Sequence, residues 1–533
     1  MSCANIFPRT LSSQLSKRSC LAAILILTGS HVKAEVRLTP LFGDNMVLQR
    51  DVSANIWGEA TPNEVISVTI DKQSVQAKTG ADGRWRAKLP PQKAGGPFDI
   101  TVTGENTITL KDVYFGDVWL IAGQSNMEWT NKSILKPEVF EVESAAANDP
   151  QMRVFTVKKN PQIAPATQVS GEWQAITPKS MANFSATGYF FGRELRQKLG
   201  VPIGIIGSYW GGMEAQPFIS VETMTQNFPD LKANLEKCFA DFPAEKLQYE
   251  EVKLPKWRAD VEKAKAEGRR IPGRPKMPLG APESPERIGA LFNGMIAPLI
   301  PLSLKGIAWY QGESNGDNLQ EALEYKTIFP LLITDWRARW GQELPFIWVQ
   351  LANYRQWQEQ PVEPKQAWPY VREAQTLALS LPSTGMALAL GNDDPTAIHP
   401  TNKIAIGKRL ADVALGVVYG QKIPYTGPLF DTMQIEGAAA RIHFKHADGG
   451  LRADGETVKG FAIAGADGKF LWADARIEGE SVILSSSQIQ KPVAVRYSWA
   501  DNPVGNLFNG AGLPASPFRT DLNASPIESP VKP

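Results

Sequence analysis

A serine that follows a run of apolar residues is the first group in this chain able to do chemistry. Residues 117–123 (DVWLIAG) end at Gly123, and Gln124, Ser125 and Asn126 come next. A strand that runs into a glycine and a serine is found in ordinary turns and where a serine nucleophile is held at the rim of a sheet. Ser125 acts as a nucleophile only if a base lies beside it, so the histidines decide between these interpretations.

Three of the four histidines lie beyond residue 34. His443 and His446 lie in the alternating stretch RIHFKH, which is typical of half-exposed strand residues. His399 follows the apolar run 385–391 and precedes a helical pattern. Because the carboxyl ends of parallel strands share one edge of a sheet, we expect His399 beside Ser125, as its general base.

The elements that must position these residues alternate along the middle of the chain. Apolar strands followed by amphipathic helices indicate an α/β fold with a parallel, three-layer α/β/α sheet. Ligands bind beyond the carboxyl ends of the strands in such sheets. The expected strands are 117–123, 202–208, 305–310, 346–351 and 385–391, and the expected helices include 188–200 and 402–416.

The stretches on either side of this core are rich in β-branched residues and in Gly and Pro turns. They predict small antiparallel β-sandwich or jelly-roll modules at 35–112 and 426–533. The α/β core then spans 113–425. Residues 223–290 are charged, helical in pattern and rich in proline, so we expect an insertion that runs over the surface.

Residues 1–34 have the pattern of a secretory signal peptide. A basic stretch without acids precedes the apolar run CLAAILILTG, and Val32-Lys33-Ala34 offers small residues for cleavage. This apolar run is too short to span a membrane permanently. We therefore expect a periplasmic or secreted protein without a membrane span after cleavage.

The net charge limits the classes of binding partner, and the cysteine content limits the possible disulfides. Loss of residues 1–34 removes four basic residues and no acid, so the formal charge of +1 falls to about −3. This argues against a nucleic-acid partner and against an anionic membrane. Of the three cysteines only Cys238 lies beyond residue 34, so no internal disulfide is expected.

Six motifs, taken in order, resemble those of the SGNH hydrolases, specifically the sialate O-acetylesterase-like branch of carbohydrate acetylesterases. The resemblance covers most of residues 40–415. It implies a Ser–His hydrolase, usually assisted by an acid, that removes acetyl groups from sugar hydroxyls without a metal or another cofactor. The motifs are DNMVLQR (44–50), GQSNMEW (123–129), PIGIIGSYWGG (202–212), LFNGMIAPLIP (291–301), IAWYQGESN (307–315) and IHPTNKIAIGKRLA (398–411).

Ester hydrolysis also needs donors that hold the oxyanion. We expect the backbone N–H of Ser125 as one donor. A glycine N–H of Gly211-Gly212, with Gly211 as the choice, is the second, because a residue without Cβ lets the substrate approach closely. Gln311 or Asn315 supplies a side-chain amide as the third, and the resemblance favours Gln311. In the alternative, Gln311 only braces the end of its strand.

The acid that orients the histidine has several candidates. Two positions where SGNH relatives carry an Asp, three and two residues before His399, hold no acid here. We predict Asp394, because its Asp-Pro sequence matches relatives more closely, with Asp393 as the alternative. Glu313 is a third candidate. A dyad without an acid is also chemically possible, since the acid only orients the imidazole and stabilises the imidazolium.

The positions of tryptophans and arginines indicate which kind of sugar the site could bind. Trp129, Trp210 and Trp309 lie within or next to the catalytic motifs, where indoles either stack on sugars or belong to the core. A carboxylate ligand usually meets an arginine. The nearest ones, Arg355 and Arg372, flank an aromatic loop rather than the nucleophile, although they could converge on a carboxylate.

These observations predict an esterase that deacetylates a carbohydrate. Acetylated hemicellulose, such as xyloglucan oligosaccharides, comes slightly ahead of O-acetyl sialic acid, which would make the protein a sialate 9-O-acetylesterase. The alternative from another class is a glycan-binding protein built from the two β-rich ends, with a silent core. Hydrolysis of a chromogenic acetate ester distinguishes the two classes.

Overall fold

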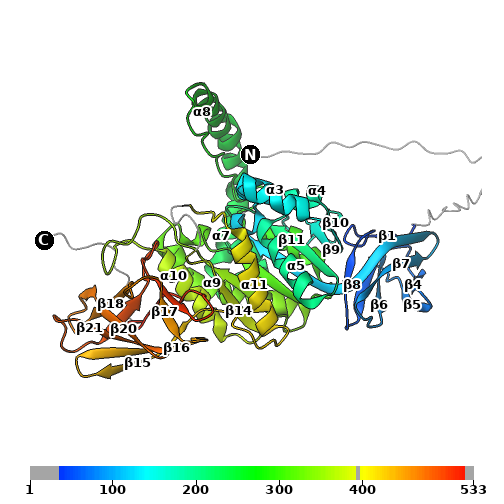
Figure 1. Cartoon of the computed structure of the whole chain (residues 1–533). Helices are drawn as coiled ribbons and strands as arrows, with labels where there is room; N and C mark the ends of the chain where they lie inside the picture. Colours follow the sequence, from blue (N-terminus) through cyan, green and yellow to red (C-terminus); the bar gives the residue numbers. More distant parts are fainter. Residues whose placement is uncertain (1–34, 392–396, 523–533) are drawn as a thin grey trace, which may run out of the picture.

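A mixed sheet forms the centre of the molecule (Figure 1). The computed structural model describes residues 35–391 and 397–522. Neighbouring strands of the core run parallel, as expected, but β10 (Trp173–Ile176) pairs antiparallel with β9 at one edge, so the sheet is mixed. In spatial order the parallel strands are β9 (Asp149–Thr156), β11 (Ile203–Tyr209), β8 (Thr107–Gly123), β12 (Gly306–Tyr310), β13 (Phe346–Gln350) and β14 (Thr384–Leu388).

Helices cover both faces of this sheet, which explains why its strands are continuous apolar runs. Successive side chains of β8 point to opposite faces. Trp119 therefore joins the core under α5 (Ala186–Leu199) and α11 (Lys403–Val417). Leu120 joins the core under α9 (Leu319–Trp340) and α10 (Trp368–Leu377).

The N-terminal β module is continuous with the core through β8. The first part of this long strand pairs antiparallel with β7, and its last part pairs parallel with β11 and β12. The expected boundary at residues 112 and 113 thus lies inside a strand that both parts share. The other strands of the module are β1 (Arg37–Leu38), β2 (Val47–Gln49), β3 (Ala54–Glu59), β4 (Val65–Ile70), β5 (Gln73–Lys78), β6 (Arg84–Leu89) and β7 (Gly95–Thr103).

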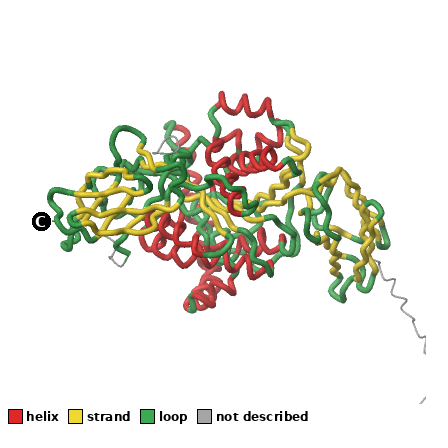
Figure 2. The backbone as a smooth tube through the Cα atoms, turned by 60° about the horizontal axis from the view of Figure 1, so that its bottom comes forward, coloured by secondary structure: helices red, strands yellow, loops and turns green. Residues whose placement is uncertain are grey.

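The C-terminal module has a hydrophobic core of its own. Its antiparallel strands lie at the end of the molecule opposite the N-terminal module (Figure 2). One sheet contains β15 (Leu429–Glu436), β16 (Ala439–Lys445), β21 (Ser481–Ser485) and β20 (Asp474–Glu478). Another contains β19 (Phe470–Trp472), β18 (Phe461–Ala464), β22 (Ala494–Tyr497) and β24 (Phe518–Arg519), and β17 (Leu451–Ala453) pairs with β23 (Leu507–Asn509).

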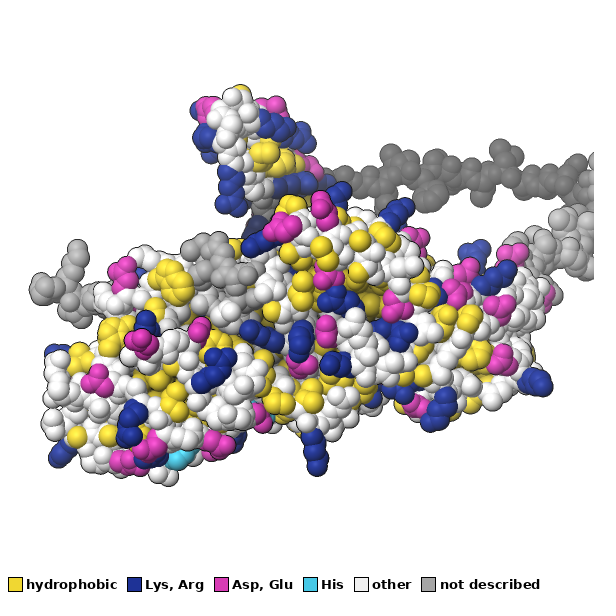
Figure 3. All heavy atoms as spheres, viewed as in Figure 1, with side chains coloured by type: hydrophobic (Ala, Val, Ile, Leu, Met, Phe, Trp, Pro, Cys, Tyr) yellow, Lys and Arg dark blue, Asp and Glu magenta, His cyan; other side chains and the backbone are white. Residues whose placement is uncertain are grey.

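The stretch expected as an insertion forms a helical projection (Figure 1). It contains α6 (Val221–Asn227), α7 (Asp230–Gln248), a π-helical turn at Tyr249–Lys253 and α8 (Leu254–Ala266). Basic side chains gather on α8, which stands away from the body of the molecule (Figure 3). Shorter helices are α1 (Ser125–Glu128), α2 (Asn131–Ile134), α3 (Pro137–Ala146) and α4 (Pro178–Asn183). Within the described ranges, no helix has the length and apolar character needed to cross a bilayer.

Candidate active site

Ser125 lies where β8 ends and α1 begins, and Gly123 makes this turn possible. Gly123 has a φ of +137°, a backbone conformation that residues with a side chain rarely adopt. A Cβ at this position would lie 2.1 Å from the carbonyl oxygen of Tyr310 on β12. The glycine therefore allows the close approach of two strands at the point where the chain turns to present Ser125.

His399 lies beside this serine. Its Nε2 atom is 2.9 Å from the Oγ atom of Ser125, within hydrogen-bond distance. Burial, and to a smaller extent the nearby Lys403 ammonium group, lowers the pKa of His399 to about 4. The imidazole is therefore neutral at neutral pH and able to accept the serine proton. His443, by contrast, lies on β16 of the C-terminal module.

The acid is not identified by these contacts. Asp394, our prediction, and Asp393, its alternative, both lie outside the described residues. Glu313 is fully buried at the end of β12, and burial raises the pKa of its carboxyl group. Its Oε1 atom accepts a hydrogen bond of 2.5 Å from Nδ2 of Asn126. Glu313 therefore contacts the residue after the nucleophile rather than the histidine.

Asn126 connects the nucleophile turn to the histidine loop. Its Nδ2 atom also donates to the carbonyl oxygen of Ile398, 2.9 Å away, directly before His399. Its Oδ1 atom accepts from Nζ of Lys403, at 2.6 Å. Both ends of this buried amide are thus engaged, and they connect the turn at Ser125 with the segment that carries His399.

Lys403 is a functional candidate that the sequence reasoning missed. It is fully buried at the start of α11, with its Nζ atom 5.3 Å from the centre of the Tyr310 ring. Burial lowers the pKa of Lys403 to about 7, although the Glu313 carboxylate acts in the opposite direction. A signal was present in the sequence: Lys403 shares a helical stripe with the buried residues Ile406 and Leu410.

The structure shows the side-chain amide of Gln311 engaged within the protein, the arrangement expected if Gln311 braces the end of its strand. Its side chain is fully buried, and Nε2 donates to Oδ1 of Asn315 (2.7 Å) and to the carbonyl oxygen of Met213 (3.2 Å). Its Oε1 atom accepts from the hydroxyl group of Tyr325, at 3.0 Å. Both amide hydrogens are therefore in use within the protein. Asn315 is engaged too, since its Nδ2 atom donates to Oε1 of Gln216.

Gly211 lies next to the nucleophile, but its N–H group is occupied. A Cβ at Gly211 would come within 3.4 Å of Cβ of Ser125. Its N–H group donates to the carboxylate of Glu128, which also pairs with Nζ of Lys159 at 2.5 Å. An oxyanion that used Gly211 would have to displace this carboxylate. The sequence did not indicate the Glu128 contact, because Glu128 and Gly211 belong to different motifs.

The backbone N–H of Ser125 belongs to the first turn of α1. N–H groups in a first turn have no acceptor within their own helix. Gln124 precedes the helix but does not cap it with its side chain. Its Oε1 atom instead accepts from the backbone N–H of Ser314, at 3.1 Å. This helix end therefore presents donors where negative charge would develop.

Comparisons with known proteins bear on what this site does. A family model described as "SASA: Carbohydrate esterase, sialic acid-specific acetylesterase" matches residues 289–416. The sialate O-acetylesterase of Mus musculus is 29% identical to this chain, and the match covers 91% of this chain and 94% of that protein. The sialate O-acetylesterase of Homo sapiens is 28% identical, and the match covers 90% of this chain and 92% of that protein. The crystal structure of XAC1771, a carbohydrate acetylesterase from Xanthomonas citri, is 36% identical, has a TM-score of 0.76, and covers 92% of this chain and 100% of that one. This chain belongs to the carbohydrate acetylesterase family.

The predicted resemblance to sialate O-acetylesterase-like carbohydrate acetylesterases is therefore confirmed, and this acetylesterase is a carboxylic ester hydrolase. Across 35–391 and 397–522, no group of three or more His, Cys, Asp or Glu side chains is placed to hold a metal ion.

Two of the three tryptophans named above lie at the site of this acetylesterase. The ring of Trp129, which is 36% exposed, is centred 5.1 Å from the imidazole ring of His399. Trp210 is half-buried, and Nζ of Lys159 lies 5.0 Å from the centre of its ring. Trp309 is a core residue, fully buried in edge-to-face contact with Phe218.

The two arginines considered as carboxylate ligands are used elsewhere. Arg372 is fully buried and donates to the backbone carbonyl oxygens of Leu351, Ala352, Ala500 and Asp501. Arg355 pairs with the carboxylate of Asp501, at 2.7 Å. Both arginines therefore fasten the aromatic loop to the segment at Ala500–Asp501 and do not converge on a ligand.

Proposed function

We propose that this acetylesterase removes O-acetyl groups from carbohydrate by a serine mechanism at Ser125 and His399, with acetylated hemicellulose as the preferred substrate. The observation that carries the mechanism is the 2.9 Å contact between Nε2 of His399 and Oγ of Ser125 at the carboxyl end of the central sheet. The core would then be an SGNH-type three-layer α/β/α domain. The signal-peptide pattern of residues 1–34 supports a periplasmic or secreted location.

The proposed reaction has two halves. In the first, Ser125 Oγ attacks the acetyl carbonyl carbon while its proton passes to Nε2 of His399. The N–H of Ser125 holds the oxyanion, and the N–H of Gly211 joins it only if Glu128 moves away. Collapse breaks the ester bond, His399 returns the proton to the sugar oxygen, and an acetyl-serine remains. In the second half, His399 takes a proton from water, whose oxygen attacks the acetyl carbonyl carbon. Collapse breaks the bond to Oγ of Ser125, His399 returns the proton to Oγ, and acetic acid leaves and ionises to acetate.

The charges at the site support an uncharged sugar. Lys159 is paired with Glu128, Lys403 is buried against Asn126, and the nearby arginines are engaged. A sugar carboxylate usually requires a cation that is free to bind it. Trp129, exposed beside His399, offers an aromatic surface for the C–H face of a sugar.

One observation favours sialate 9-O-acetylesterase activity as the second candidate. If the oxyanion displaced Glu128 from Gly211, Lys159 would lose its ion-pair partner next to the reacting group. The freed ammonium group could then meet a sialic acid carboxylate. The mammalian relatives are called sialate O-acetylesterases.

Acetate release from acetylated xyloglucan, acetylated xylan and 9-O-acetyl sialic acid tests the proposal. We expect the highest kcat/KM on a hemicellulose substrate. Lys159→Met is the matched variant, and it should leave hemicellulose deacetylation within a few-fold of the parent. An exclusive preference for sialic acid that is lost in Lys159→Met would replace the proposed substrate with the second candidate. Absence of acetate release from all three would overturn both.

A further inference from the structure

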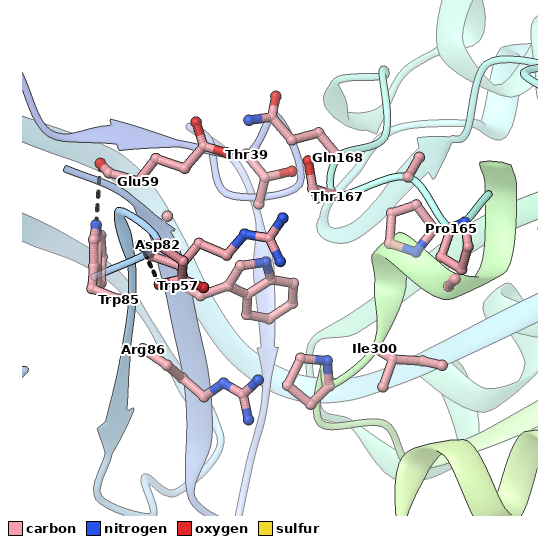
Figure 4. A pocket seen from close by; sticks show the side chains of 16 residues that line it. Thr39, Trp57, Glu59, Asp82, Trp85, Arg86, Pro165, Thr167, Gln168 and Ile300 are labelled. Atoms are coloured by element: carbon pink, nitrogen blue, oxygen red, sulfur yellow. Dashed lines mark hydrogen bonds between the residues drawn. The ribbon is translucent and has the colours of Figure 1, made fainter. Parts of the chain in front are cut away.

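A cavity of about 680 Å³ lies between the N-terminal module and the core (Figure 4). None of its lining residues belongs to the catalytic site described above. One wall is formed by β3 and β6, and the other by the core segments 165–168 and 297–301. Its volume falls within the range of about 300 to 1,000 Å³ that is typical of ligand pockets.

The wall on the N-terminal module combines the indole of Trp57 with charged groups. In the antiparallel pair of β3 and β6, Trp57 lies opposite Arg86, and Glu59 lies opposite Arg84. Because alternate residues of a strand share a face, these four side chains are on the same side of the sheet. The indole of Trp57 and the guanidinium group of Arg86 point across the cavity towards the core (Figure 4).

The opposite wall is fixed to this sheet by hydrogen bonds. Nδ2 of Asn55 donates to the carbonyl oxygen of Pro301, at 2.8 Å, and Oγ of Ser303 donates to the carbonyl oxygen of Ser53, at 2.9 Å. Thr167 and Gln168 place exposed polar groups on the core side. The cavity is therefore bounded by two tethered surfaces.

The balance of charge indicates the class of ligand. Glu59 and Asp82 offset Arg84 and Arg86, and among the described residues no ion pair joins these groups to one another. An anion in the cavity would meet two carboxylates, and a cation would meet two guanidinium groups. A sugar hydroxyl can donate to a carboxylate and accept from a guanidinium group, while its ring C–H face packs on the indole. This set of side chains fits an uncharged carbohydrate.

One segment of chain connects the cavity with the catalytic site. Lys159 pairs with Glu128 beside Gly211, and Pro165 lines the cavity a few residues later. Even fully extended, the chain from Lys159 to Pro165 spans no more than about 22 Å. A single oligosaccharide of moderate length could therefore reach both.

We propose that this cavity is a second carbohydrate-binding site, which holds an uncharged stretch of the polysaccharide that is deacetylated at Ser125. The identity of that polysaccharide rests on the function proposed above, whereas the presence of the site does not. Binding at the cavity would raise the local concentration of acetylated residues at the catalytic serine.

Calorimetric titration of Ser125→Ala with unacetylated xyloglucan oligosaccharides tests the site without turnover. We expect Trp57→Ala or Arg86→Ala, added to Ser125→Ala, to weaken binding at least tenfold. Gln168→Ala, an exposed change on the other wall, should also weaken it, so the test does not depend on the folding of the Trp57 variant. Trp472→Ala removes a 38% exposed indole from the C-terminal module and should leave binding unchanged.

The kinetic counterpart uses the enzyme with an intact Ser125. Trp57→Ala should raise KM for acetylated xyloglucan much more than KM for a small chromogenic acetate. Unchanged affinity in the Trp57, Arg86 and Gln168 variants would overturn the second site. Binding of N-acetylneuraminic acid that depends on Trp57, in place of the neutral oligosaccharide, would overturn the ligand class. Oligosaccharide binding that depends on Trp57 but without acetate release would leave the site intact and reject the proposed function instead.

Discussion

The neighbouring strands β8 and β12 both end in polar residues at the candidate active site, but these residues have different surroundings. After β8, Gly123 turns the chain so that Ser125 is half-exposed and contacts His399. After β12, the amide of Gln311 and the carboxylate of Glu313 are buried and bonded within the protein. The end of β8, with Ser125, is thus the open strand end. The end of β12, with Gln311 and Glu313, is the closed strand end, whose polar groups contact only the protein. A motif rich in polar residues can therefore serve a site without touching the substrate.

The largest effect is expected at the open strand end. Ser125→Ala or His399→Ala should lower kcat by about three orders of magnitude or more, because each removes a partner of the proton transfer. The rate is measured with a chromogenic acetate ester, and thermal unfolding reports on the fold. Ser133→Ala, an exposed serine in the same region, is the control and should retain normal turnover. Turnover near the parent level in Ser125→Ala would show that another residue is the nucleophile.

The next effect concerns the acid. Asp394→Asn should lower kcat by about two orders of magnitude or more, because an amide orients imidazole in the wrong tautomer. Asp393→Asn, its immediate neighbour, is the matched control and should cost much less. The reverse ranking would assign the role to Asp393. If neither matters while Glu313→Gln does, the supporting strand end contributes the acid.

A smaller effect, on stability, is expected at the closed strand end. Gln311→Leu keeps the size of the side chain but removes the acceptor of the buried Tyr325 hydroxyl group and the amide donor to the carbonyl oxygen of Met213. The free energy of unfolding should fall by about 1–3 kcal/mol for each such group. Denaturant unfolding measures this loss, and Gln356→Leu, an exposed glutamine, should change little. A fall in kcat of a hundredfold or more with unchanged stability would restore Gln311 as an oxyanion donor.

The sequence was informative about which residues meet and less so about how their polar atoms are used. Apolar runs identified the strands that end at Ser125 and Gln311, and the sequence alone brought Ser125 and His399 together. It missed β9, whose first residues, Asp149 and Pro150, are atypical of a strand. It also placed a domain boundary inside β8, because the change of composition near residue 112 occurs without a break in the strand.

The contacts of Gln311 could not be predicted from the sequence, for a different reason. Its amide is consumed by Met213 and Asn315, and partners of this kind are set by tertiary contacts that no spacing in the sequence reports. The same holds for Glu128, which reaches Gly211 from another motif. Lys403 is the one missed residue that carried a local signal, namely a charge in an apolar stripe.

The smallest expected effect concerns Lys403, which donates a hydrogen bond to Asn126 next to Ser125. Burial, and to a smaller extent the positive charge of Lys403, lowers the pKa of His399. His399 works as a base only when neutral, so with its pKa at about 4 the acid limb of kcat/KM should lie near that value rather than near 6.5. Lys403 has its own pKa at about 7, so it is charged throughout the range of this limb. Lys403→Met removes the repulsion, and the limb should move to higher pH.

Two variants make this shift interpretable. Lys408→Met, an exposed change on the same helix whose lysine pairs with Asp412, should leave the limb in place. Asp394→Asn, if that carboxylate contacts His399, should move the limb to lower pH, because a nearby negative charge raises the pKa of an imidazole. The two shifts of the acid limb have opposite signs. They therefore distinguish the effect of Lys403, which lowers the pKa of His399, from that of Asp394, which would raise it. If the acid limb of Lys403→Met lies at the same pH as that of the parent, the charge of Lys403 does not affect His399. Lys403 would then act only by holding Asn126 in position.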